Sequence, residues 1–191
     1  MKYKDVLLYK ILRPIIKVLF RIIWTPKYIG LENIPKNGRV VLAGNHTNIL
    51  DSVFLISCTK RNIHFLAKKE LWKGPKKLLF NNLGLISVDR SIHDHDALVH
   101  AKKYLENELV IGIFPEGTTR KGRKQMLPFK FGAVKMAHDT KTEIVPFVIN
   151  GKYKLFSRSL KIEFLKPISI KDNLEEENNK LYNMIARKLE E

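Results

Sequence analysis

The residues best suited to acid–base chemistry are His46 and Asp51, which stand five positions apart after the apolar run RVVLAG. A histidine titrates near neutral pH, so it can take a proton from a hydroxyl and later release it. A carboxylate on the far ring nitrogen would fix the tautomer and stabilise the imidazolium. The alternative is structural: Thr47 or Asn48 caps a helix that starts near residue 49, and Asp51 favours its positive end. The spacing leaves both interpretations open.

The sequence contains no recognisable motif for an enzymic nucleophile. The chain contains no G-x-S-x-G motif, which marks the nucleophile of many hydrolases. Its one cysteine, Cys58, lies in the apolar run SVFLISC, where a buried thiol is expected, and it cannot form an intrachain disulfide. If His46 is a base, the attacking hydroxyl therefore belongs to a substrate. That pattern favours a transferase without an acyl-enzyme intermediate.

The stretch FPEGTTR holds residue types that bind phosphate. Gly117 permits close backbone approach, Thr118 offers a hydroxyl and Arg120 offers a planar guanidinium. Glu116 could hold a substrate hydroxyl or orient an arginine. Residues 120–135 contain six Lys or Arg and no acid, a pattern that also fits a solvated basic loop. Lys68 and Arg90 follow other apolar runs and could equally be surface ion-pair partners.

The stretch SIHDHDALVH raises the question of a metal site, because imidazole and carboxylate bind divalent ions. It contains His93, His95 and His100. The preferred interpretation is that Asp94 or Asp96 caps a helix start. The sequence has no cysteine cluster and no H-E-x-x-H motif. We therefore expect no metal and no cofactor, and the alternative is a metal-dependent hydrolase built on His93, His95 and His100.

Short β-rich runs alternate with helix-like stretches after residue 38, which predicts an α/β domain with a mostly parallel central sheet flanked by helices. The first four runs end at Asn45–His46, at Lys68, at Arg90 and at Glu116. Parallel strands would gather these groups at the sheet edge where ligands bind. The predicted strands are 39–44, 63–67, 85–88, 110–114 and 143–149, with 159–165 as an edge strand; the predicted helices are 50–58, 75–82, 94–107, 129–140 and a closing helix from about 173.

Residues 5–24 predict an amphipathic helix with an aliphatic stripe opposite a basic one. Its length of about 30 Å could span a bilayer, but a charge at every turn argues against a span. A signal peptide fits badly because the apolar run is interrupted. We expect residues 1–30 to be a membrane-interface segment and residues 31–191 to be the catalytic domain. The alternative is a helix packed on its own domain.

The formal net charge of +16 calls for anionic partners. Nucleic acid, anionic lipid and phosphorylated substrates are the candidates. A nucleic-acid-binding protein would show salt-sensitive binding, but no recognised DNA-binding signature is present. The charge alone does not choose among these classes.

Taken together, the motifs resemble the glycerolipid acyltransferase family. The resemblance rests on four blocks in order across residues 40–150, namely NHTNILD, GLISVDR, FPEGTTR and IVPFVI. It implies that His46, helped by Asp51, deprotonates an acceptor hydroxyl, which attacks the thioester of acyl-CoA or acyl-carrier protein. Two departures stand out: the first block often has serine in place of Asn48, and Thr119 intervenes before Arg120.

The family further implies an acceptor with a glycerol phosphate, held by Arg90 and by Glu116, Gly117 and Thr118. Lys68 and Arg120 are further phosphate candidates. The implied reaction is transfer to the sn-2 hydroxyl of 1-acyl-glycerol 3-phosphate, giving phosphatidic acid. Glycerol 3-phosphate or another lysophospholipid is the alternative acceptor. The implied partners are a lysophospholipid, an acyl thioester, acyl-carrier protein as one possible donor and an anionic membrane on its cytoplasmic face, with no nucleic acid.

Overall fold

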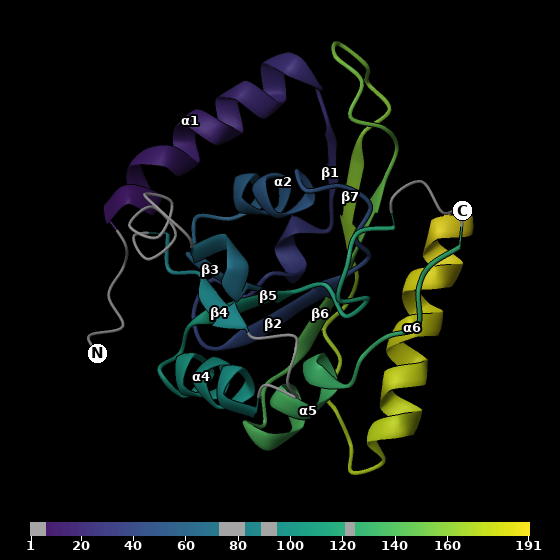
Figure 1. Cartoon of the computed structure of the whole chain (residues 1–191). Coiled ribbons are helices and arrows are strands. Elements are labelled where there is room, and N and C mark those ends of the chain that lie inside the picture. The colour runs from purple at the N-terminus through teal and green to yellow at the C-terminus, as the bar shows by residue number, and fades with distance from the viewer. Residues whose placement is uncertain (1–6, 73–82, 89–94, 121–124) are drawn as a thin grey trace.

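The chain forms a seven-stranded sheet in the order β1-β7-β6-β2-β5-β3-β4 (Figure 1). The structure, a computed structural model, describes residues 7–72, 83–88, 95–120 and 125–191. Neighbouring strands are parallel except for the antiparallel pair of β6 and β7. The strands are β1 (Lys27–Ile29), β2 (Val40–Gly44), β3 (Ile63–Lys68), β4 (Ile86–Val88), β5 (Val110–Ile113), β6 (Ile144–Asn150) and β7 (Lys161–Phe164).

Helices cover both faces of the sheet (Figure 1). On one face lie α1 (Leu7–Ile23) and α2 (Asp51–Cys58), and on the other lie α4 (His95–Glu106), α5 (Gly132–Asp139) and α6 (Leu174–Glu190). Two short 3₁₀ turns, η1 (Leu31–Asn33) and η2 (Lys69–Trp72), complete the described elements.

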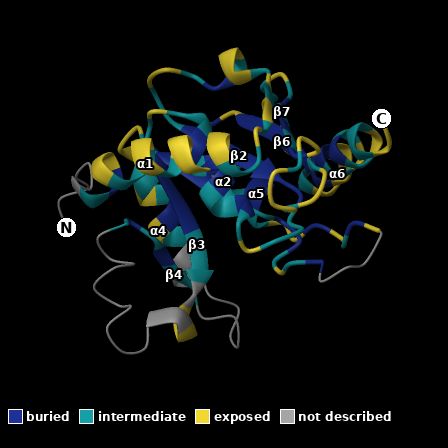
Figure 2. Cartoon of the chain, turned by 90° about the horizontal axis from the view of Figure 1, so that it is seen from above, coloured by how far each residue is buried: buried dark blue, intermediate teal, exposed yellow. Residues whose placement is uncertain are grey.

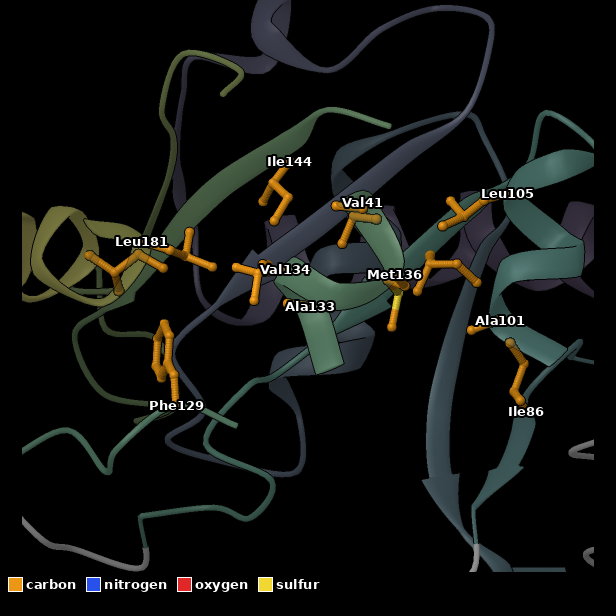
Figure 3. Close-up of a cluster of buried hydrophobic side chains, with 14 of the residues drawn as sticks. Val41, Ile86, Ala101, Leu105, Phe129, Ala133, Val134, Met136, Ile144 and Leu181 are labelled. Carbon is orange, nitrogen blue, oxygen red and sulfur yellow. The ribbon is translucent and has the colours of Figure 1, made fainter. Parts of the chain in front are cut away.

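The two faces carry separate hydrophobic cores because successive residues of a strand point to opposite sides. Val41 of β2 packs with Ala133 and Leu181 against α5 and α6 (Figure 3). Leu42 packs with Phe54 of α2 in the other core. Because β2 is buried along its whole length, the turn that follows it starts from the packed core of the domain.

Most predicted elements are confirmed, with one correction and one further strand, β1, for which there is no prediction. Residues 159–165 were expected to be an edge strand, but β7 lies inside the sheet and β1 takes the edge. The three residues of β1 are too few to show a strand period in the sequence. The predicted closing helix is confirmed as α6, whose N-cap Asn173 accepts the amide of Glu176. The predicted helix 75–82 lies outside the described residues.

The N-terminal helix packs on its own domain, as one of the two interpretations of its sequence predicts, while its contact with a membrane stays a prediction. Tyr9 and Phe20 are buried against the domain. Ile15 and Val18 are each about half exposed, and Figure 2 shows exposed residues along this helix. No helix in the described ranges is both long and apolar enough to cross a membrane. The division of the chain at residue 30 stays a prediction, although residues 27–29 belong to the sheet.

Candidate active site

The carboxyl ends of β2, β5 and β6 lie side by side because these strands are parallel. Ala43 is in register with Ile113, and Gly44 is in register with Phe147. The segments that leave β2 and β5 are therefore neighbours at one edge of the sheet. This is the edge at which open α/β sheets bind ligands.

His46 and Asp51 meet at this edge. The imidazole Nδ1 lies 3.0 Å from Asp51 Oδ2, so the ring donates to the carboxylate when Nδ1 carries the proton. The same oxygen accepts the backbone amides of Thr47 at 2.6 Å and Asn48 at 2.8 Å. Asp51 is fully buried and the His46 side chain is 16% exposed. The arrangement leaves His46 Nε2 as the nitrogen that can accept a proton from a ligand.

The start of α2 explains how a separation of five residues brings the two side chains together. The N-cap of the helix is Leu50, and neither Thr47 nor Asn48 caps it through its side chain. Instead, Asn48 Oδ1 accepts the amide of Leu50 within the preceding turn. Asp51, in the first helical turn, then bonds back to the turn and to His46. The helix and the dyad therefore share one carboxylate.

Tyr153 is a site residue that the sequence reasoning missed. Its hydroxyl donates to Asp51 Oδ1 at 2.6 Å. Burial and the charge of Asp51 raise the pKa of the Tyr153 phenol well above its usual value, so the group remains a donor. Tyr153 comes from the loop after β6. Applying the strand-end rule to the fifth β-run, as well as to the first four, would have found it.

Glu116 joins the two loops of the site. Its Oε1 accepts the backbone amide of His46 at 2.8 Å, and its Oε2 accepts the amide of Leu127 at 2.9 Å. Arg120 lies beside it, with Nε 3.7 Å from Oε1, and the Arg120 amide donates to the carbonyl of His46 at 3.0 Å. Both carboxylate oxygens thus position the backbone on either side of the site. Contact of Glu116 with substrate stays a prediction.

The turn around Gly117 has a shape that requires glycine. Its φ of +71° lies in the left-handed region, and an added Cβ would lie 3.0 Å from Lys130 Cε. Thr118 follows on the exposed surface, whereas Arg120 is 7% exposed. The structure thus brings the third block next to His46. Its binding of phosphate stays a prediction.

An aromatic wall stands behind the dyad. The His46 ring stacks on Phe114 with centroids 4.1 Å apart, and Phe65 and Phe147 pack behind Phe114. Asn45 anchors the start of the turn, because its amide nitrogen donates to Ile149 O at 2.8 Å and its oxygen accepts Ile149 N at 2.7 Å. The Phe114 ring thus covers one face of the imidazole with an apolar surface.

Other predicted site residues lie partly or wholly outside the residues that the structure describes. Lys68 ends β3, but its side chain is not described, and Arg90 lies outside the described residues. His93 and Asp94 also lie outside them, and α4 begins at His95. Among the side chains that are described, no three His, Cys, Asp or Glu form a group that could hold a metal.

Cys58 is remote from the dyad in the structure. It ends α2, whereas Asp51 begins it, a separation of about 10 Å along the helix axis. Burial raises the pKa of its thiol far above the usual value, so the thiolate is disfavoured. This environment agrees with the prediction that Cys58 is a buried, unreactive thiol.

Comparison with known proteins places this chain in a family. The Acyltransferase family model matches residues 25–150. The 1-acyl-sn-glycerol-3-phosphate acyltransferase of Borreliella burgdorferi is 35% identical over 134 residues, which are 69% of this chain and 53% of that protein. The enzyme of the same name from Helicobacter pylori is 33% identical over 136 residues, 68% of this chain and 56% of that protein. The chain thus spans about half the length of these relatives.

A solved structure shares the fold. The crystal structure of the 1-acyl-sn-glycerophosphate acyltransferase PlsC from Thermotoga maritima superimposes with a TM-score of 0.79 and 23% identity, over 95% of this chain and 78% of that one. The family match includes every block from the His46 turn to β6. The chain therefore belongs to the acyltransferase family.

Proposed function

We propose that the protein transfers a fatty acyl group from a thioester to the free hydroxyl of a lysophospholipid, foremost the sn-2 hydroxyl of 1-acyl-glycerol 3-phosphate. The observation that carries this proposal is the contact between His46 and the buried carboxylate of Asp51 at the ligand-binding edge. The names of the relatives support the choice of acceptor.

The reaction is a direct transfer. His46 Nε2 takes the proton of the acceptor hydroxyl as its oxygen attacks the thioester carbonyl. The tetrahedral intermediate collapses, the carbon–sulfur bond breaks, and the imidazolium returns the proton to the departing thiolate. Asp51 stabilises the imidazolium between these steps. The donor is acyl-CoA or acyl-carrier protein, and the products are phosphatidic acid and a free thiol.

The phosphate of the acceptor is assigned to the basic side of the site. Arg120 lies next to the His46 turn, and Lys130 packs against Gly117. Lys68 and Arg90 are the further candidates for this phosphate, as the family resemblance implies. Guanidinium and ammonium groups both bind phosphate, the first through two parallel bonds.

The test is an acyl-transfer assay with purified protein, comparing lysophosphatidate, glycerol 3-phosphate and a lysophospholipid without a terminal phosphate, each with both donors. Lysophosphatidate should give the highest kcat/KM. A higher value for glycerol 3-phosphate would replace the acceptor and keep the reaction class. Absence of transfer to every acceptor, together with salt-sensitive binding to DNA or RNA, would favour the nucleic-acid alternative. Activity abolished by chelation would favour a metal-dependent hydrolase.

Tyr153 should act as a positioning residue. Tyr153→Phe removes one hydroxyl and keeps the ring, so Asp51 Oδ1 loses the Tyr153 donor but keeps the Thr47 hydroxyl at 3.3 Å, and the backbone bonds to Oδ2 remain. We expect kcat to fall on the order of tenfold, in line with loss of one bond to a charged group, with KM nearly unchanged. Steady-state kinetics measure the split.

The matched control is Tyr182→Phe, because Tyr182 bonds to Met126 O through its hydroxyl. Its kcat should equal that of the native protein. If Tyr153→Phe lowered only the melting temperature and left kcat intact, the hydroxyl would be structural and the positioning role would be wrong.

The exposed side of α1 is proposed to lie in the membrane interface. Ile11, Ile15, Val18 and Ile22 recur at helical spacing and are each more than half exposed, while Lys10, Lys17 and Arg21 form an exposed basic stripe. An apolar face beside basic residues is typical of helices that lie on anionic bilayers. We infer peripheral association through this helix.

The double substitution Ile15→Ser/Val18→Ser should weaken binding to anionic vesicles on the order of tenfold or more, because it removes aliphatic area from the lipid. Vesicle co-sedimentation measures this. Removing the whole helix is a poorer test, since Tyr9 and Phe20 would leave the core. Ile15→Leu/Val18→Leu is the matched control, and its binding should be unchanged. Native affinity in the serine variant would exclude the interface role.

A further inference from the structure

The loop of residues 151–160, between β6 and β7, presents two large apolar side chains to solvent. Leu155 is 65% exposed and Phe156 is 79% exposed. Because β6 is parallel to β2, this loop leaves the same edge of the sheet as the His46 turn. In Figure 1 it rises beyond the sheet next to the end of α1. Burial within the chain does not explain either side chain.

The backbone at Phe156 strengthens this point. Its φ is +57°, in the left-handed region that bulky residues rarely adopt. Glycine or asparagine would occupy this position with less strain. An exposed aromatic residue in a strained conformation does not serve the stability of the free protein, and such outliers concentrate at functional positions.

The loop is fixed to the helix that carries the exposed apolar face. The Phe156 amide donates to the carbonyl of Ile23 at 2.7 Å. Ile22, one residue earlier, is 63% exposed. Figure 2 shows exposed residues along α1. The two apolar residues of the loop therefore lie next to the end of α1.

The charge around the tips identifies the partner. The loop carries Lys152, Lys154 and Arg158, all exposed, and no acidic residue between 151 and 160. Basic side chains around apolar tips match a bilayer with anionic headgroups, where each cation near the surface adds to binding.

The same loop reaches the dyad. Tyr153, three residues before Phe156, donates to Asp51, and the Trp24 ring meets the Tyr153 ring edge-on at 5.9 Å. Trp24 directly follows α1. The loop therefore links its exposed tip to the residue that bonds to Asp51.

We propose that the β6–β7 loop inserts Leu155 and Phe156 into an anionic phospholipid bilayer and that this contact orders Tyr153 on Asp51. The link to Asp51 rests on the proposed acyl transfer, whereas the lipid contact does not. The loop is thus a second membrane contact, separate from α1, that couples docking to the active site.

The first experiment uses substitutions that separate stability from insertion. Phe156→Asn suits the left-handed backbone, so its melting temperature should equal or exceed that of the native chain, while its binding to vesicles of phosphatidylglycerol and phosphatidylcholine should fall about fivefold or more. Phe156→Leu keeps an apolar tip and should bind like the native chain. Native binding by Phe156→Asn would overturn the proposal, as would equal losses in both variants.

The second experiment places a probe at the tip. In Phe156→Trp, the fluorescence difference from the native chain should shift to shorter wavelength with these vesicles and be quenched by brominated lipids. No shift would overturn insertion. A shift without vesicles that grows with protein concentration would overturn it in favour of a second copy of the chain.

The third measurement tests the coupling. Phe156→Asn should lower kcat on vesicle-embedded lysophosphatidate several-fold relative to Phe156→Leu when both variants are fully bound at high lipid. Equal kcat values would overturn the coupling. A native chain inactive on every acceptor would remove the proposed function, while the fluorescence result would still decide the lipid contact.

Discussion

Replacing His46 with alanine is expected to reduce kcat for acyl transfer by about 10²–10⁴-fold, which is the usual contribution of a general base. The acceptor hydroxyl would then face water or a weak backbone acceptor in place of the imidazole held by Asp51 at 3.0 Å. The loss should be similar with acyl-CoA and acyl-carrier protein, because the base acts on the acceptor. The assay compares initial rates of both donors with lysophosphatidate.

The chain offers a matched control on its surface. His138 Nε2 lies 3.1 Å from Asp172 Oδ1, a similar contact before β6, at the opposite edge of the sheet. His138→Ala should retain native kcat. Circular dichroism and melting temperature should confirm that His46→Ala is folded, since its side chain is already partly exposed. Full activity in a folded His46→Ala variant would contradict the assignment of His46 as the general base.

Replacing Asp51 with asparagine is expected to lower kcat by about 10²–10⁴-fold while the fold survives. Asparagine can keep its oxygen on the amides of Thr47 and Asn48 and turn its NH₂ toward the oxygen of Tyr153. The turn is then still closed, but the charge that stabilises the imidazolium is gone. The measurement is kcat beside an unfolding curve.

Asp51→Ala gives the contrasting result. It removes the acceptor of two backbone amides and should cost up to about 1–3 kcal/mol for each, so stability falls with activity. Asp172→Asn is the matched control, because it neutralises the carboxylate beside His138 at the surface. Its kcat should be native. If Asp51→Asn kept native kcat and a native melting temperature, Asp51 would serve only the start of the helix.

The sequence allowed the parallel sheet to be predicted because its strands are buried on both faces and read as continuous apolar runs. Burial of β2 from Val40 to Gly44 shows this directly. It also located the His46 turn and the segment from Glu116, since both follow such runs. The short strand β1 gave no signal, because three residues carry no period.

The long-range hydrogen bonds of the site could not be predicted in the same way. Glu116 bonds to the amide of Leu127, and Tyr153 bonds to a carboxylate 102 residues earlier. Such contacts depend on how loops meet after the sheet has formed, and residue type alone does not specify them. Helix α1 shows the same limit: its aliphatic positions divide between the core and the exposed face only once α2 is in place.

The way α1 is held has a consequence for how substrate arrives. The Tyr9 hydroxyl donates to Arg61 O at 3.1 Å and accepts the amide of Ile63 at 3.2 Å, and both bonds oppose rotation of the helix about its own axis. If its exposed face lies in the leaflet, the whole protein takes a single tilt, with the His46 turn at one height above the lipid. An acceptor then reaches the site by lateral diffusion in two dimensions, without leaving the leaflet for water.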